Sequence, residues 1–160
     1  MKNYPVEEIK EFMNELLINE RYDSFYMYEV RIKTALDYYI SGKRNMEFYE
    51  NDDTELMEAS DDRTEYVCWK DIKHTVFDLI KGKRLPISFK VILMFNRENI
   101  VRLVEMNNLP LRPEDITGLF MNIYYENGEL LVTTGTSLKV FTLDKTLENL
   151  WDETVGKYYI

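Results

Sequence analysis

The chain has 160 residues, 45 % of them hydrophobic and 14 % aromatic, which is enough for one globular domain with a sizeable core. No apolar run approaches the roughly 20 residues of a membrane-spanning helix, and the N-terminus is acidic and amphipathic, unlike a secretory signal. A single cysteine excludes an internal disulfide framework, so we expect a soluble, cytoplasmic protein of one domain over residues 1–160.

The net charge of −9 is concentrated in one segment of the chain. Residues 47–65 contain nine acidic side chains and one arginine, which gives −8 and leaves −1 for all other residues. Because apolar residues are scarce there, about residues 50–63 are predicted to be a solvated surface loop. The alternative is a docking site for a basic partner.

The N-terminal third is predicted to be one helix followed by strands. Residues 5–18 have apolar side chains at helical spacing, which is typical of an amphipathic helix that faces a core. Extended segments are predicted at residues 25–32 and 36–40. A turn at residues 41–45 then leads to a return strand at residues 46–49.

The middle of the chain is predicted to alternate between strands and helices. A short strand at residues 65–68 leads into a helix, which Gly82 ends in the left-handed conformation. Residues 87–95 form a strand that is apolar on both faces. Asn96 is predicted to cap the helix that follows.

The strongest local pattern is Asn127-Gly128, which lies between two runs of alternating apolar residues and predicts a β-hairpin. A two-residue loop pairs Glu126 with Glu129, Tyr125 with Leu130, Ile123 with Val132 and Met121 with Thr134. A second turn at Gly135-Thr136-Ser137 is predicted to lead into a third strand, Leu138 to Thr142. A final helix follows, capped by Asp144 or Thr146.

Together these elements predict an α+β fold, in which amphipathic helices pack on an antiparallel meander sheet. Written coarsely, each half of the chain has the order helix, three strands, helix. DNA sliding-clamp domains and TATA-binding-protein-like folds share a related order. Two pseudo-repeated halves and an unrelated single-sheet layer therefore both remain open.

Cys68 and His74 are the only thiol and the only imidazole in the chain. Cys68 lies just before a predicted helix N-terminus, where the dipole favours a thiolate, so a thiol-dependent enzyme is one hypothesis. However, residues six apart on a helix point in different directions, and cysteine is commonly buried, so a structural role is preferred. One cysteine and one histidine are too few ligands for a transition-metal site, and no cofactor is predicted.

The segment around Gly135 is the most polar part of the predicted meander. Its hydroxyl groups could hold a phosphate if they converge in a turn, but it lacks the ending of a phosphate-binding loop, so a structural turn is preferred. The candidate residues of this polar turn are Thr133, Thr134, Thr136 and Ser137.

Two predicted loops, Gly42-Lys43-Arg44 and Gly82-Lys83-Arg84, repeat one basic motif. If they meet in space, Lys43, Arg44, Lys83 and Arg84 form a basic patch that can contact phosphates. Otherwise these side chains solvate two separate turns.

Two blocks, WKDIKHTVFDLIKGKRLPISFKVIL (69–93) and LLVTTGTSLKVFTLDKTLENLWDE (130–153), resemble a family of uncharacterised proteins from clostridia-type Gram-positive bacteria. That family is known only as a domain of unknown function. The resemblance implies a bacterial, single-domain, cytoplasmic protein and brings no catalytic or binding residues.

The preferred functional hypothesis is a non-catalytic protein-interaction or binding module, which includes self-association through a tyrosine-rich surface. The alternatives are a nucleic-acid-associated module that uses the two basic loops, and a thiol-dependent enzyme at Cys68. Exposed apolar surface around Tyr38-Tyr39 and Tyr158-Tyr159 would favour a protein partner, whereas a basic groove there would favour nucleic acid.

Overall fold

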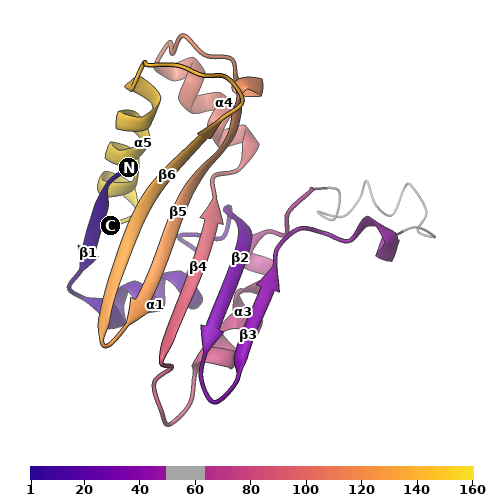
Figure 1. The fold of residues 1–160 in the computed structure, drawn as a ribbon, viewed down its shortest axis with the longest axis vertical. Helices are drawn as coiled ribbons and strands as arrows, with labels where there is room; N and C mark the ends of the chain where they lie inside the picture. The colour runs from indigo at the N-terminus through magenta and orange to yellow at the C-terminus, as the bar shows by residue number, and fades with distance from the viewer. Residues whose placement is uncertain (50–63) are drawn as a thin grey trace.

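The computed structural model describes residues 1–49 and 64–160 (Figure 1). Within these residues, six strands form one antiparallel sheet in the order β1-β6-β5-β4-β2-β3. The strands are β1 (Asn3–Val6), β2 (Tyr26–Lys33), β3 (Asp37–Ser41), β4 (Ser88–Met94), β5 (Ile116–Glu126) and β6 (Glu129–Leu138). The helices are α1 (Ile9–Leu17), α3 (Trp69–Ile80), α4 (Arg97–Met106) and α5 (Thr146–Tyr158), with the 3₁₀ helices η1 (Met46–Tyr49) and η3 (Pro113–Asp115).

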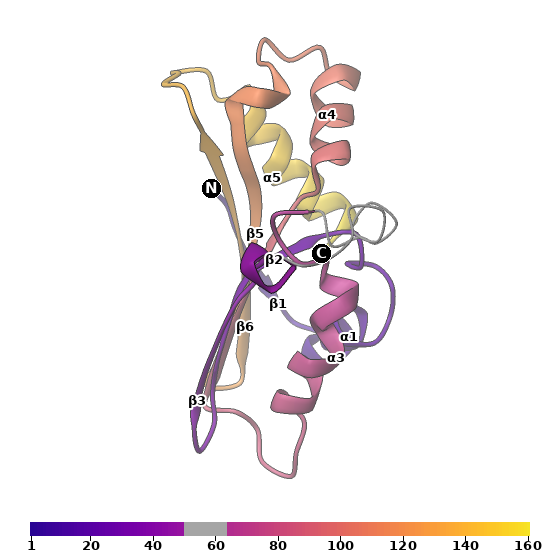
Figure 2. The same cartoon turned by 90° about the vertical axis from the view of Figure 1, so that its right-hand side faces the viewer.

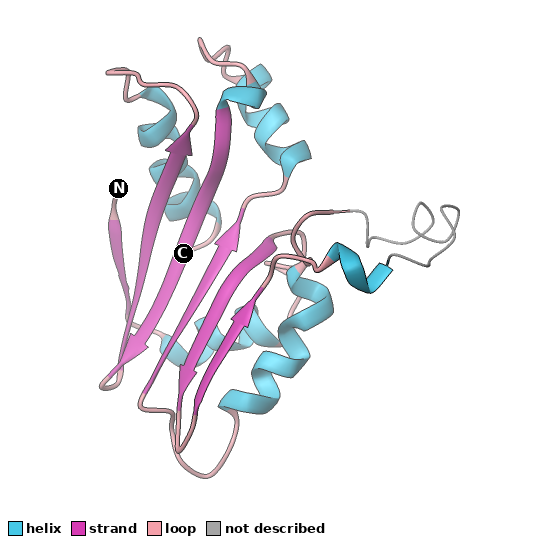
Figure 3. Cartoon of the chain, turned by 45° about the vertical axis from the view of Figure 1, so that its right-hand side comes forward, coloured by secondary structure: helices cyan, strands magenta, loops and turns pink. Residues whose placement is uncertain are grey.

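All four of these α-helices pack on the same side of the sheet. Figure 2 shows the sheet nearly edge-on with the helices on one side only, and Figure 3 shows the other side uncovered. We call this uncovered side the open face. The predicted α+β fold is therefore confirmed, and its helical layer is one-sided.

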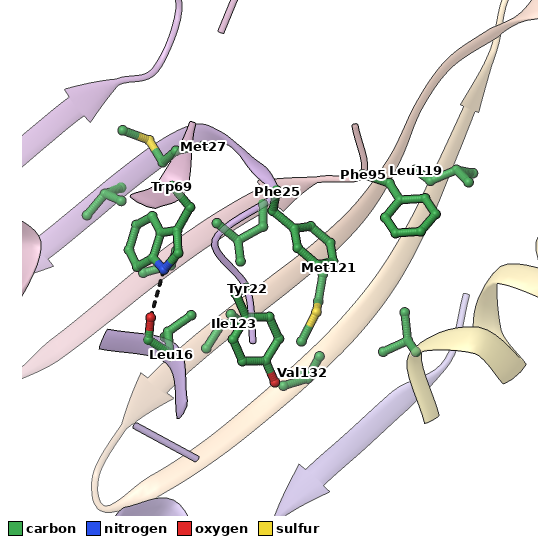
Figure 4. Packing of buried hydrophobic residues seen from close by; sticks show 14 of the residues in the cluster. Leu16, Tyr22, Phe25, Met27, Trp69, Phe95, Leu119, Met121, Ile123 and Val132 are labelled. Carbon is green, nitrogen blue, oxygen red and sulfur yellow. Dashed lines mark hydrogen bonds between the residues drawn. The ribbon is translucent and has the colours of Figure 1, made fainter. Parts of the chain in front are cut away.

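The hydrophobic core lies between the sheet and the helices, as the alternation of side chains along a strand requires. Two tryptophans anchor it: Trp69 Nε1 donates a hydrogen bond to the carbonyl of Leu16 (2.7 Å), and Trp151 Nε1 donates to the carbonyl of Phe120 (2.8 Å). Figure 4 shows Trp69 and other core side chains between the two layers. The helix-facing residues of the strands are almost fully buried, among them Val30, Val91, Leu93, Met121, Ile123 and Val132.

The β5–β6 hairpin has the predicted register. Glu126 pairs with Glu129, Tyr125 with Leu130, Ile123 with Val132 and Met121 with Thr134. Asn127 and Gly128 both have positive φ angles, 53° and 77°, which is the backbone that a two-residue type I′ turn requires.

We expect Gly128→Ala to lower the free energy of unfolding by about 1 kcal/mol, because an L side chain disfavours positive φ. No atom lies within 4 Å of the Cβ that alanine would add, so the backbone alone would cause the loss. Denaturant unfolding measures this loss. Gly128→Asn is the control, since asparagine tolerates this conformation, and an equal loss in both variants would exclude the backbone as the cause.

The predicted turn at Gly135-Thr136-Ser137 is wrong. These residues continue β6, and they pair with Phe120, Leu119 and Gly118 of β5. β5 is 11 residues long, so it offers a partner for the whole of this segment. The predicted third strand, residues 138–142, is also wrong, because residues 139–145 form no regular element before α5.

Two glycine predictions also fail. Gly42-Lys43-Arg44 is not a turn: the N–H of Gly42 donates to the carbonyl of Tyr28 (2.9 Å), and the carbonyl of Gly42 accepts from the N–H of Val67 (2.9 Å). The chain therefore stays extended beyond β3. Gly82 does not have a positive φ, and α3 instead ends where Lys81 becomes extended (φ −64°, ψ 148°).

Other local predictions have mixed outcomes. The side chain of Asn96 caps α4, because its Oδ1 accepts a hydrogen bond from the N–H of Asn99 (2.8 Å). The predicted return strand at residues 46–49 is a 3₁₀ helix, η1. The predicted acidic loop at about residues 50–63 lies outside the described residues.

The two halves of the chain are not arranged alike in the sheet. In the described residues, two strands rather than three lie between the helices of each half, β2 and β3 in the first and β5 and β6 in the second. β4 lies between β2 and β5, whereas β1 lies at the far edge beside β6. The arrangement thus gives no support to a pseudo-repeat.

Candidate binding surface

The two predicted basic loops lie at opposite ends of β2. Gly42 bonds to Tyr28 near the start of β2, whereas Ile87, just after the second loop, donates its N–H to the carbonyl of Lys33 at the other end (2.8 Å). An eight-residue strand is about 25 Å long, so the loops cannot share one phosphate. The predicted basic patch of Lys43, Arg44, Lys83 and Arg84 is therefore not formed.

The hydroxyl groups of the predicted polar turn do not converge. Thr134 is buried, donates to Asp152 of α5 and accepts from the N–H of Lys2 (2.9 Å). Thr133 points to the opposite face and donates to Asn3 Oδ1 (3.0 Å). Since alternate residues of a strand face opposite sides, Thr133, Thr134, Thr136 and Ser137 do not form one phosphate site.

Cys68 is half-buried immediately before α3, and its backbone bridges to Tyr26. His74 lies on the exposed side of α3, six residues further along. Within residues 1–49 and 64–160, no group of three or more His, Cys, Asp or Glu side chains is arranged to hold a metal ion. The predicted structural role of Cys68 stays a prediction.

The open face carries one continuous row of large side chains across the sheet. Tyr39 of β3 pairs with Arg31 of β2, Arg31 with Lys90 of β4, Lys90 with Tyr124 of β5, and Tyr124 with Leu131 of β6. Because paired residues of antiparallel strands share a face, these five form what we call the central row. A groove of about 340 Å³ crosses the row from Tyr39 to Tyr124.

The charges of the central row are unevenly compensated. Arg31 Nε donates to Glu29 Oε2 (2.8 Å), which raises the pKa of the guanidinium, and Arg31 also lies 4.6 Å from the centre of the Tyr39 ring. Lys90 is half-buried and forms no ion pair with any residue that the structure describes. Arg31 and Lys90 are directly opposite each other, an arrangement that is unfavourable for like charges.

A second hollow, which we call the aromatic cleft, lies beside the end of β4 and the first residues of β5. Its volume is about 670 Å³. The Tyr28 ring stacks on Tyr66 at 5.5 Å and meets Phe120 edge-on at 5.6 Å. Burial raises the pKa of the Tyr66 hydroxyl, and it is also the main cause of the raised pKa of Tyr26 at the same cleft.

One of the two cations at the aromatic cleft, Arg97, has a structural role. The guanidinium of Arg97 donates to the carbonyls of Ile116 and Pro113, both at 2.7 Å, and so holds α4 against the start of β5. Besides its rings, the cleft is lined by polar side chains, among them Glu65 and Lys139. It opens beside the open face, because Tyr28 and Phe120 belong to both surfaces.

The alternation in β5 and β6 places Tyr124 and Leu131 on one mixed face. Their neighbours in the central row could not be found in this way, because the strand order joins β4 to β2 and β5 across long stretches of chain. The available signal was the alternation of charged residues in β2, which includes Arg31, and the single cation within the apolar β4, Lys90.

A comparison with protein families gives one match. A family described as being of unknown function, DUF5721, matches residues 15–160. The chain belongs to the DUF5721 family. Searches of the curated proteins and of the solved structures found no match.

Membership of DUF5721 confirms the resemblance to a family of unknown function. The clostridial origin stays a prediction. No helix in the described parts of this DUF5721 protein combines the length and the apolar composition that crossing a bilayer requires. The cytoplasmic location likewise stays a prediction.

Proposed function

We propose that this DUF5721 protein is a non-catalytic binding module that holds a protein partner on the open face of its sheet. The observation that supports this is the one-sided helical layer, which leaves the aromatic and apolar side chains of the other face without a cover among the described residues (Figure 2). Tyr39 is 59 % exposed and Tyr124 is 40 % exposed. The other large side chains of this face that are at least partly exposed are Tyr28, Met94, Phe120 and Leu131, whereas Ile92 is buried.

The composition of the open face resembles that of a protein interface. An antiparallel sheet that faces only water normally alternates apolar residues inside with polar residues outside. Here the outward-facing residues include several aromatic rings. Tyrosine and arginine are enriched among the residues that contribute most to binding at interfaces. A contiguous exposed surface of this kind is typical of a protein–protein interaction site. A second copy of the chain is one form that the partner can take.

Nucleic-acid binding is the second candidate function, and a different set of residues now favours it. Arg31, Lys33 and Lys90 lie between the exposed rings of Tyr39 and Tyr124 on the same face. Aromatic rings beside cations are a common arrangement for single strands, whose bases stack on the rings.

The experiment is affinity capture with the full-length protein from a lysate of its native host, together with sedimentation velocity for self-association. We expect Tyr39→Ser/Tyr124→Ser to abolish the capture or the self-association, because it removes the two exposed rings of the central row. Met106→Ser/Phe141→Ser is the matched control, since both side chains are exposed and lie outside the central row.

Thermal unfolding of each variant checks that it is folded. Equal binding by the wild type and the Tyr39→Ser/Tyr124→Ser variant would contradict the proposal. So would a monomeric wild type that captures no protein.

A further inference from the structure

We propose that the groove between Tyr39 and Tyr124 binds an acidic peptide segment of the partner, with a carboxylate of that segment on Lys90 and Arg31. This inference rests on the proposed binding function and adds the chemistry of the partner. Three features of the open face support it: the paired cations, the uncompensated lysine and the dimensions of the groove.

The first feature is the direct opposition of two cations. Arg31 and Lys90 are cross-strand partners. In an antiparallel pair, the Cβ atoms of opposite residues are about 5 Å apart, so the two positive charges repel each other. An anion placed between them removes this repulsion and accepts hydrogen bonds from both side chains.

The second feature is that Lys90, alone among the three cations of this groove, has no carboxylate hydrogen-bonded to it or directly opposite it in the sheet. Arg31 is hydrogen-bonded to Glu29, and Lys33 is the cross-strand partner of Asp37. Lys90 is flanked by Arg31 and Tyr124 and forms no ion pair with a described residue. Its half-buried position, in a groove where water is partly excluded, strengthens the attraction of an anion.

The third feature is the length of the groove. Tyr39 and Tyr124 are on β3 and β5, which are separated by β2 and β4. Three interstrand spacings amount to about 14 Å, which is the length of about four residues of an extended peptide. A short segment can therefore contact both rings while its central carboxylate lies on Lys90.

The surroundings of the groove favour a peptide over a nucleic acid. Carboxylates border the cations on the same face of the sheet, namely Glu29, Asp37, Glu126 and Glu129. A single-stranded nucleic acid carries a negative charge on every nucleotide and meets this border wherever it leaves the groove. A peptide with one or two separated carboxylates avoids that repulsion.

The test is a titration of the ¹⁵N-labelled full-length protein at low ionic strength, followed by the chemical shifts of its backbone amides. The probe is a decapeptide of serine with two glutamates at its centre, separated by one serine. The comparison probes are its glutamine–serine counterpart and a ten-nucleotide oligothymidylate. We expect the glutamate peptide to shift amides of β2 and β4 around Arg31 and Lys90, and the glutamine peptide to shift none.

Lys90→Met keeps the apolar stem of the side chain and removes its charge. We expect this variant to weaken binding of the glutamate peptide about tenfold, since it removes a charge-assisted hydrogen bond. Lys10→Met is the matched control, because Lys10 is an exposed cation on α1, and we expect it to bind as the wild type does.

Equal shifts from the glutamine peptide, shifts elsewhere on the protein, or unchanged binding by Lys90→Met would each overturn the inference. Tighter binding of the oligothymidylate would overturn it in favour of nucleic acid. Partner capture that depends on Tyr39 and Tyr124, without any binding of the glutamate peptide, would leave the proposed function standing and remove this inference alone.

Discussion

Gly42→Ala is expected to lower the free energy of unfolding by about 3 kcal/mol, because the added methyl group has no space. A Cβ at this position would lie 1.6 Å from the carbonyl oxygen of Met27 and 2.6 Å from its carbon. Both are backbone atoms, so no side-chain rotation relieves the clash. Gly42 also joins three segments, through its hydrogen bonds to Tyr28 and Val67.

Denaturant unfolding of Gly42→Ala measures this loss. The matched control is Gly82→Ala, where the nearest atom to a new Cβ is the carbonyl oxygen of Arg84 at 3.9 Å and φ is not positive. We expect the control to change the stability by less than about 0.5 kcal/mol. Similar stabilities of the two variants would show that β2 and the chain after β3 do not approach each other as closely as described.

Trp69→Ala is expected to cost about 3–5 kcal/mol, which is typical of removing a buried tryptophan. Trp69 is fully buried at the start of α3, and its indole N–H donates to the carbonyl of Leu16. The substitution would leave a cavity between α3 and α1 and an unpaired carbonyl at the end of α1. Trp69→Phe fills part of the cavity without restoring the hydrogen bond, so we expect an intermediate loss.

Phe141→Ala serves as the control for aromatic truncation, because Phe141 is 91 % exposed. We expect a change within about 0.5 kcal/mol. The midpoint and slope of urea unfolding, followed by tryptophan fluorescence of Trp151, give the stabilities of all three variants. A Trp69→Ala variant as stable as Phe141→Ala would mean that α3 does not pack against α1 through this side chain.

The features predicted correctly depend on residues close together in the sequence. Asn127-Gly128 sets the backbone of its own turn, and the turn then fixes the register of β5 and β6. Asn96 caps α4 through a contact three residues away. Such features need no knowledge of the rest of the fold, so the sequence is sufficient for them.

The features that were missed depend on distant neighbours. Gly135 was interpreted as a turn residue, but Phe120 of the long β5 strand pairs with it and keeps it extended. Gly42 matched a turn pattern, but glycine is needed there because any side chain would clash with the backbone of Met27. The central row joins Arg31 to Lys90, and no local pattern specifies a pairing between residues so far apart in the chain.

The position of β1 has a kinetic consequence. Asn3 pairs with Thr133 and Val6 with Leu130. β1 therefore cannot pair until β6, the last strand of the sheet in chain order, is available. Closing so long a loop is entropically costly and slows folding. Until β1 arrives, the backbone of β6 remains an unpaired edge that another chain can add to. Pro5 has no N–H to offer, so once β1 has docked it makes a poor template for further strands and limits aggregation at that edge.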